Sequence, residues 1–212
     1  VGKRMTTAPS TVQHALTWAQ TLGLPRLEAQ MLLLHALGRP LNDRAWLLMN
    51  DQSALQADTH QHFAHAVQRR LATEPVAYIT GVKEFFGLHL QVDARVLDPR
   101  ADTETLVEWA LSCLADVPTP QVVDLGTGSG AIALALKHSR PDAHVHAVDA
   151  STDALAVAQA NATQLGLEVR FHAGSWLSPF DANMKFDAIV SNPPYIASTD
   201  AHLAALTHEP LS

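Results

Sequence analysis

The spacing of hydrophobic residues changes along this chain of 212 residues. Over the first 75 residues apolar side chains recur every three to four positions, which predicts amphipathic helices. The expected helices cover residues 11–22, 25–37, 43–50 and 54–72, and glycine, proline or a capping polar residue borders each of them. The pattern predicts a small helical bundle as a first domain, residues 1–75.

An alternating pattern follows, which is typical of strands with one buried face. We expect residues 76–80, 84–86 and 88–93 to form a β-hairpin, within a linker that covers residues 76–98. A helix is then expected after a cap at Asp102 or Thr103, because apolar residues from Leu106 to Leu114 again follow the helical spacing.

From residue 121 onward, predicted strands and helices alternate. Strands are expected at 122–125, 144–148, 168–172 and 186–190, with helices at 131–138 and 153–165. This order predicts an α/β fold with a parallel, Rossmann-like sheet and right-handed crossovers, in a third domain at residues 99–212. Ligands of such sheets bind at the carboxyl ends of the strands.

Composition narrows the class of protein. The chain is 47% hydrophobic, its longest apolar runs are shorter than the ~20 residues that span a bilayer, and no signal peptide is visible. Cys113 is the one cysteine, so no intrachain disulfide can form, which fits a reducing cytoplasm. We expect Cys113 to fill a small space in the core, and the protein to have no contact with a membrane.

Charge argues against a nucleic-acid substrate. The formal net charge is −7, made up of +2 for residues 1–75, −4 for residues 76–120 and −5 for residues 121–212. Proteins that bind nucleic acids normally carry a basic face. The mildly basic first section is the better candidate for contact with an acidic or ribosome-linked partner. No metal site is expected at His60, His62 and His65. Only His62 and His65 share a helix face, whereas a closed zinc site needs four ligands.

A glycine-rich loop follows the first strand of the predicted sheet. It consists of Gly126, Thr127, Gly128, Ser129 and Gly130, and its glycines allow a tight turn close to a ligand. Such a loop also fits a dinucleotide-binding oxidoreductase, or a turn with no ligand at all. Asp149 ends the second strand, where a carboxylate can accept hydrogen bonds from both hydroxyls of a ribose, so an adenosine-containing cofactor is favoured.

The fourth strand ends in Asn192, Pro193, Pro194 and Tyr195. Proline fixes φ and has no N–H, so this turn directs backbone carbonyls outward. The Asn192 side-chain carbonyl and the Pro193 main-chain carbonyl can accept both N–H bonds of one planar NH2 group, with the Tyr195 ring packed on its face. The turn therefore predicts a site where an amide-type nitrogen is alkylated; the alternative is that Pro-Pro merely ends the strand.

These motifs together resemble a known family. The runs DLGTGSG, VD, SW and NPPY, with Trp176 after the third strand, resemble the class I S-adenosylmethionine-dependent methyltransferases. The helical first section, the run EPVAYITGVKEFFGLHLQVD and the run VLDPRADTETLVEWAL resemble the protein N5-glutamine methyltransferases of bacterial class 1 peptide-chain release factors. This resemblance covers nearly all of residues 8–210.

The resemblance implies a cofactor, a substrate and roles for single residues. The cofactor is S-adenosylmethionine, with S-adenosylhomocysteine as product, and the substrate is the glutamine of a Gly-Gly-Gln loop in a release factor. The loop of residues 126–130 would line the methionine and ribose, Asp149 would hold the ribose and Trp176 would lie by the adenine. Asn192 would touch both cofactor and substrate, and a monomer is expected.

Some features depart from this family or leave alternatives open. Asp98 and the pair Ala101-Asp102 surround Pro99-Arg100 where relatives carry other residues, and the last strands of the family's sheet are expected to be missing after residue 212. Three other functions stay open. They are a glutamine methyltransferase of a large-subunit ribosomal protein, an adenine-N6 or guanine-N2 nucleic-acid methyltransferase, and a binding module without catalysis.

Overall fold

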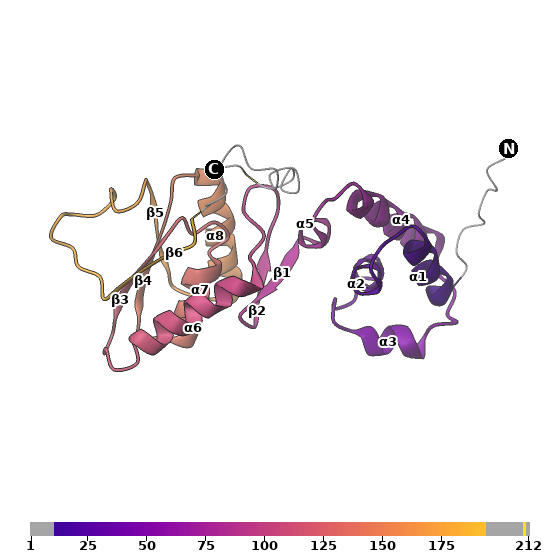
Figure 1. The fold of residues 1–212 in the computed structure, drawn as a ribbon, viewed down its shortest axis with the longest axis horizontal. Coiled ribbons are helices and arrows are strands. Elements are labelled where there is room, and N and C mark those ends of the chain that lie inside the picture. The colour runs from indigo at the N-terminus through magenta and orange to yellow at the C-terminus, as the bar shows by residue number, and fades with distance from the viewer. Residues whose placement is uncertain (1–10, 194–209, 211–212) are drawn as a thin grey trace. The chain divides into compact units, whose positions relative to one another are not determined.

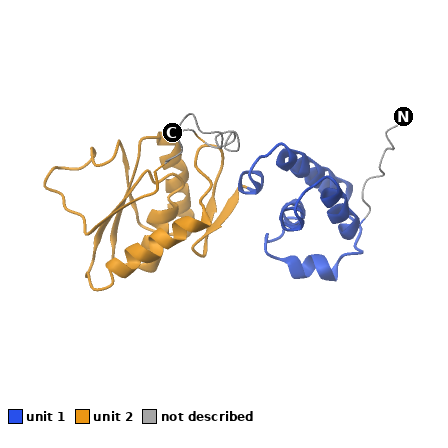
Figure 2. Cartoon of the chain, in the orientation of Figure 1, with its two compact units in different colours: residues 1–80 blue, residues 81–212 orange. Residues whose placement is uncertain are grey.

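The computed structural model describes residues 11–193 and residue 210, and the chain divides into two compact units (Figure 2). Unit 1 covers residues 1–80 and unit 2 covers residues 81–212. The division falls at Gly81, whose φ of 73° lies in the left-handed region that glycine adopts readily.

Unit 1 is a helical bundle, as the sequence predicts. Its interior contains fully buried apolar side chains from several helices, among them Leu32, Phe63 and Val67. Thr11 caps the first helix by accepting a hydrogen bond from the His14 backbone N–H at 3.2 Å. The helices described in this unit are α1 (Val12–Thr21), α2 (Arg26–Ala36), α3 (Arg44–Met49), α4 (Ala57–Leu71) and α5 (Val76–Thr80).

The prediction of a strand at residues 76–80 was wrong, because this segment is the short helix α5. The Pro75 carbonyl accepts hydrogen bonds from the backbone N–H groups of Tyr78 and Ile79, and the Thr80 hydroxyl donates to the Val76 carbonyl. Ile79 is buried against the core of unit 1. Burial in this core stabilises a helical turn although β-branched residues favour strands.

Unit 2 begins with a β-hairpin formed by β1 (Val82–Phe85) and β2 (Leu88–Gln91). Phe86 and Gly87 form its turn with φ values of 51° and 77°, both in the left-handed region that tight hairpin turns require. In β2, buried and exposed residues alternate. Asp98, one of the residues that differ from the family pattern, is 7% exposed and pairs with Lys83 of β1 at 3.1 Å.

The rest of unit 2 contains a parallel sheet, which confirms the predicted α/β fold. The strands lie in the order β5-β4-β3-β6, and each neighbouring pair is parallel. Their carboxyl ends therefore meet at one edge. The described strands are β3 (Gln121–Leu125), β4 (His144–Asp149), β5 (Arg170–Ala173) and β6 (Ala188–Ser191).

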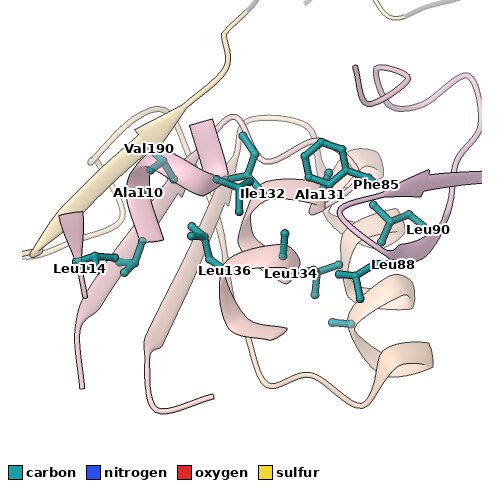
Figure 3. Packing of buried hydrophobic residues seen from close by; sticks show 14 residues of the cluster. Phe85, Leu88, Leu90, Ala110, Leu114, Ala131, Ile132, Leu134, Leu136 and Val190 are labelled. Atoms are coloured by element: carbon teal, nitrogen blue, oxygen red, sulfur yellow. The ribbon is translucent and has the colours of Figure 1, made fainter. Parts of the chain in front are cut away.

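Three helices cover one side of this sheet (Figure 1): α6 (Glu104–Cys113), α7 (Ala131–Ser139) and α8 (Thr152–Leu165). A core between these helices, the sheet and the hairpin joins apolar side chains such as Leu90, Ala110, Leu134 and Val190 (Figure 3). On the other side of the sheet, Phe180 and Phe186 pack against the core around Val123.

Cys113 is exposed, so the prediction that it fills the core was wrong. The buried stripe of α6 consists of Val107, Ala110 and, just beyond the helix, Leu114, which leaves Cys113 outside it. A short 3₁₀ helix, η1 (Ala101–Thr103), precedes α6. Within residues 11–193, no helix has the length and apolar character needed to cross a membrane.

Candidate functional site

A cavity of about 670 Å³ lies at the carboxyl edge of the sheet in unit 2. Each of the four strands contributes residues to its wall: Gly126 after β3, Asp149 at the end of β4, Trp176 after β5 and Asn192 after β6. The parallel sheet thus brings together side chains that are far apart in the sequence, at the edge where ligands of such sheets bind.

The backbone of the glycine loop is held by the neighbouring strand. The N–H groups of Gly126 and Thr127 both donate to the Val148 carbonyl, at 2.8 and 3.0 Å, and the Gly128 N–H donates to Asp149 Oδ2 at 2.9 Å. A dinucleotide site needs such N–H groups for its pyrophosphate. Because the protein already engages these donors, the geometry disfavours the dinucleotide alternative.

The loop residues face two directions. Gly126 and Gly128 line the cavity, and a Cβ atom built on either would meet no other atom within 4 Å. Thr127 and Ser129 are 6% and 3% exposed, and Gly130 packs so closely on α8 that its Cβ would lie 3.1 Å from that of Ala158. The first two glycines therefore leave room for a ligand, whereas the last one permits close packing of helices.

Asp124 lies under the loop and is fully buried. Its Oδ2 accepts a hydrogen bond from the Thr127 hydroxyl at 2.6 Å. Burial raises the pKa of this carboxyl to about 6, although the Thr127 hydrogen bond acts in the opposite direction. Asp124 supports the loop from inside the protein, and it is not among the residues that line the cavity.

Asp149 connects the loop to α8 and still faces the cavity. Its Oδ2 accepts from the Gly128 N–H and its Oδ1 accepts from the Ser151 N–H, both at 2.9 Å. Each carboxylate oxygen has two lone pairs, so both oxygens can accept one more hydrogen bond. Ser151 itself caps α8 by accepting from the Ala154 N–H. The Asp149 carboxylate is therefore oriented and has acceptor capacity for two hydroxyl groups of a ligand.

Trp176 stands on the wall that follows β5. Its side chain is 61% exposed and its φ of 51° lies in the left-handed region, which large residues rarely adopt. Strained backbone of this kind persists where surrounding contacts hold it and is frequent at ligand sites. The indole thus offers an exposed, flat surface to the cavity.

Asn192 and Pro193 form the wall after β6. The Asn192 Nδ2 donates to the hydroxyl of Thr103 at 3.2 Å, and the preceding Ser191 hydroxyl donates to the Leu125 carbonyl at 2.8 Å. The end of β6 is thereby attached both to β3 and to the start of α6. Pro194 and Tyr195 lie outside the described residues, so their assigned roles stay predictions.

Two parts of this site were not predicted from the sequence. Asn161 of α8 is fully buried; its Nδ2 donates to the carbonyls of Gln91 and Ser129, and its Oδ1 accepts from the Gln91 N–H at 2.7 Å. It therefore joins the hairpin to the glycine loop. A polar residue on the otherwise apolar stripe of α8 was the available signal. Residues 94–97, which form a further wall of the cavity, carry no such signal.

A second cluster of polar groups lies within the sheet, away from the cavity. His146 of β4 and His172 of β5 stack, with their rings joined by a 2.9 Å contact between Nδ1 and Nε2. Burial lowers the pKa of His146 to about 4, with a further contribution from the nearby His172. In the part of the chain that the structure describes, no three residues of metal-binding type come together.

Comparisons with known proteins agree with this geometry. Residues 102–209 match the model of the methyltransferase small domain, and residues 12–81 match that of the PrmC N-terminal domain. The release factor glutamine methyltransferase of Bordetella pertussis is 50% identical over 182 residues, which cover 86% of this chain and 66% of that protein. That of Xylella fastidiosa is 47% identical over 190 residues, covering 89% and 68%.

The similarity extends to the release factor glutamine methyltransferase of Escherichia coli, which is 42% identical over 193 residues, or 91% of this chain and 68% of that protein. The chain thus spans about two thirds of the length of these relatives. The matches run through both the helical unit and the unit with the cavity. On these similarities the chain belongs to the family of the release factor glutamine methyltransferases.

Proposed function

We propose that this protein methylates the side-chain nitrogen of the glutamine in the Gly-Gly-Gln loop of class 1 release factors, with S-adenosylmethionine as methyl donor. One observation carries the proposal: the residues proposed to bind the donor and the substrate line the same cavity. Asp149 would accept hydrogen bonds from the ribose hydroxyls, and Asn192 and Pro193 would accept those of the substrate NH2 group. The relatives that are 42–50% identical over the aligned residues are named release factor glutamine methyltransferases, which supports this proposal.

The cavity fits an adenosine-containing donor. Gly126 and Gly128 leave space where other residues would place a Cβ, Asp149 has free lone pairs for two ribose hydroxyls, and Trp176 offers a flat ring for an adenine. When bound, S-adenosylmethionine supplies an electrophilic methyl group, and S-adenosylhomocysteine is left after transfer.

The residues after β6 act on the acceptor. An amide nitrogen is a weak nucleophile because its lone pair is delocalised into the carbonyl, so it needs to be held in line with the methyl group. The Asn192 Oδ1 and the Pro193 carbonyl accept its two N–H bonds and stabilise the positive charge that develops on nitrogen. A new N–C bond forms as the C–S bond breaks. The nitrogen then loses one proton, which becomes acidic only during transfer.

The substrate class is tested by supplying labelled S-adenosylmethionine to the full-length protein with four acceptors. These are a release factor, the same factor with its Gly-Gly-Gln glutamine changed to alanine, ribosomal protein and nucleic acid. We expect label in the unaltered release factor and none in the glutamine variant. Label in nucleic acid or ribosomal protein alone would overturn the proposal in favour of one of the other methyltransferase activities.

The assigned role of Asn192 is tested with Asn192→Ala, which removes one acceptor. We expect transfer to fall at least a hundredfold, as when one oxyanion-type donor is removed from an enzyme, with the fold retained. The matched control is Asn183→Ala, since Asn183 is exposed and does not line the cavity. Near-normal turnover of Asn192→Ala would remove Asn192 from this role.

A further inference from the structure

Thr103 and Asn192 are 89 positions apart in the sequence, yet a hydrogen bond joins their side chains. The Asn192 Nδ2 donates to the Thr103 Oγ1 at 3.2 Å. Thr103 is the last residue of η1 and directly precedes α6. Its hydroxyl caps no backbone N–H of that helix, so it has no capping role there.

Two further contacts fix the place of this hydroxyl. The neighbouring Glu104 accepts a hydrogen bond from the Phe86 N–H in the hairpin turn at 3.0 Å. Along the same helix, Ala110 is buried in one core with Val190 of β6 (Figure 3). Because the hairpin contacts the start of α6 and the core packs along its length, the Thr103 hydroxyl lies at the carboxyl end of β6.

The contact has a chemical consequence for the Asn192 amide. A side-chain amide can turn by 180° and present either its oxygen or its NH2 group. Only the oxygen can accept an N–H bond of an acceptor substrate; two facing NH2 groups would leave donors unpaired, which is costly in a water-poor site. With Nδ2 bonded to Thr103, it is Oδ1 that is left for a ligand. No donor reaches this oxygen from the residues that the structure describes.

We propose that Thr103 is a positioning residue, which holds the Asn192 amide at the carboxyl end of β6 with its oxygen left to receive the NH2 group of the substrate. The inference rests on the proposed transfer to an amide nitrogen. Thr103 acts through Asn192 and is not among the residues that line the cavity. Its loss lowers the fraction of productive encounters, and it leaves unchanged Asp149 and Trp176, the residues assigned to the ribose and the adenine of the methyl donor.

The test compares Thr103→Val, which keeps the shape but lacks the hydroxyl, with Thr103→Ser, which keeps the hydroxyl. We expect T103V to lower kcat for release-factor methylation three- to tenfold, as for the loss of one neutral hydrogen bond, and T103S to restore most of it. The Kd for S-adenosylmethionine should stay within twofold of the original protein. T105V is the matched control, because Thr105 is exposed on the same helix.

Equal kcat values for T103V and the original protein would overturn the positioning role and leave the proposed function intact. If T103S loses as much kcat as T103V, or if T103V weakens S-adenosylmethionine binding as much as it lowers kcat, the role of Thr103 is purely structural. If T103V does not fold, T103A takes its place. If the original protein transfers no methyl group to a release factor, the proposed function fails. The NMR exchange rate of the Asn192 side-chain amide protons, expected to rise in T103V and not in T103S, then tests the contact alone.

Discussion

The Asp149 carboxylate accepts the backbone N–H of Gly128 at 2.9 Å, across the gap between the glycine loop and the end of β4. The same carboxylate accepts the Ser151 N–H at the start of α8. One side chain therefore sets the shape of the loop and also presents acceptors to the cavity. Its removal should affect cofactor binding more than the stability of the sheet.

Asp149→Ala is expected to raise the Kd for S-adenosylmethionine about ten- to a hundredfold, because hydrogen bonds to a charged group are lost. Isothermal titration calorimetry measures this change. Asp149→Asn keeps one carbonyl acceptor, so its Kd should lie between those of the original protein and of Asp149→Ala. The control Asp181→Ala, at an exposed position, should bind S-adenosylmethionine as the original protein does. Unchanged affinity in Asp149→Ala would show that the carboxylate does not hold the ribose.

Asn161→Ala is expected to lower the free energy of unfolding by about 2–4 kcal/mol, because it leaves the Gln91 backbone groups and the Ser129 carbonyl without their buried partner. Urea denaturation measures the loss. Gln159→Ala on the exposed side of the same helix is the control and should change stability by less than about 0.5 kcal/mol. Similar values for both would refute a structural link between hairpin and loop.

Gly130→Ala should lose stability both from backbone strain and from overpacking, whereas Gly87→Ala should lose stability from backbone strain alone. Both glycines have positive φ values, 83° and 77°, but only a Cβ at Gly130 would lie 3.1 Å from atoms of Ala158 and Leu134. We expect Gly87→Ala to cost about 1–2 kcal/mol from backbone strain, and Gly130→Ala to cost about 1–3 kcal/mol more from overpacking. Equal losses in urea denaturation would contradict the packing role of Gly130.

Asp124 should make stability fall as the pH rises. Its folded pKa of about 6 lies above the ordinary value of 3.8, so the folded state holds the proton more tightly. The stabilisation is complete below about pH 4 and is lost as the pH rises through about 6, with a total on the order of 3 kcal/mol. Asp124→Asn removes this titration. Between pH 4 and 7.5 the unfolding free energy of the original protein should therefore fall relative to that of Asp124→Asn. A difference that stays constant with pH would contradict the raised pKa of Asp124.

His146 should act in the opposite direction. Its folded pKa of about 4 lies below the ordinary 6.5, because burial and the adjacent His172, Arg170 and His144 disfavour the charged ring. The stabilisation is present above pH 6.5 and is lost as the pH falls through about 4. His146→Gln should flatten the loss of stability in acid, whereas His89→Gln, at an exposed position of the hairpin, should not. Identical pH profiles for both would refute this.

Much of the fold follows from local spacing in the sequence. The helical period over the first section predicts the bundle, and the order of strands and helices after residue 121 predicts the parallel sheet, because burying one face imposes a period on each element. Gly126, Asp149, Trp176 and Asn192 could be proposed as neighbours for the same reason. Each follows a parallel strand, and the carboxyl ends of such strands share one edge.

The tertiary structure decided which groups meet across the chain. Residues 76–80 form a helix because Ile79 is buried in the core of unit 1, and Cys113 is exposed because it lies beside the buried stripe of α6. The contacts of Asn161 with Gln91 and of Thr103 with Asn192 span 70 and 89 positions. The sequence alone determined the period of each element and the edge at which the site forms. Which side chains form these hydrogen bonds depends on how α6 and α8 pack against the hairpin and the sheet. That packing sets distances between residues far apart in the sequence, which no local pattern encodes.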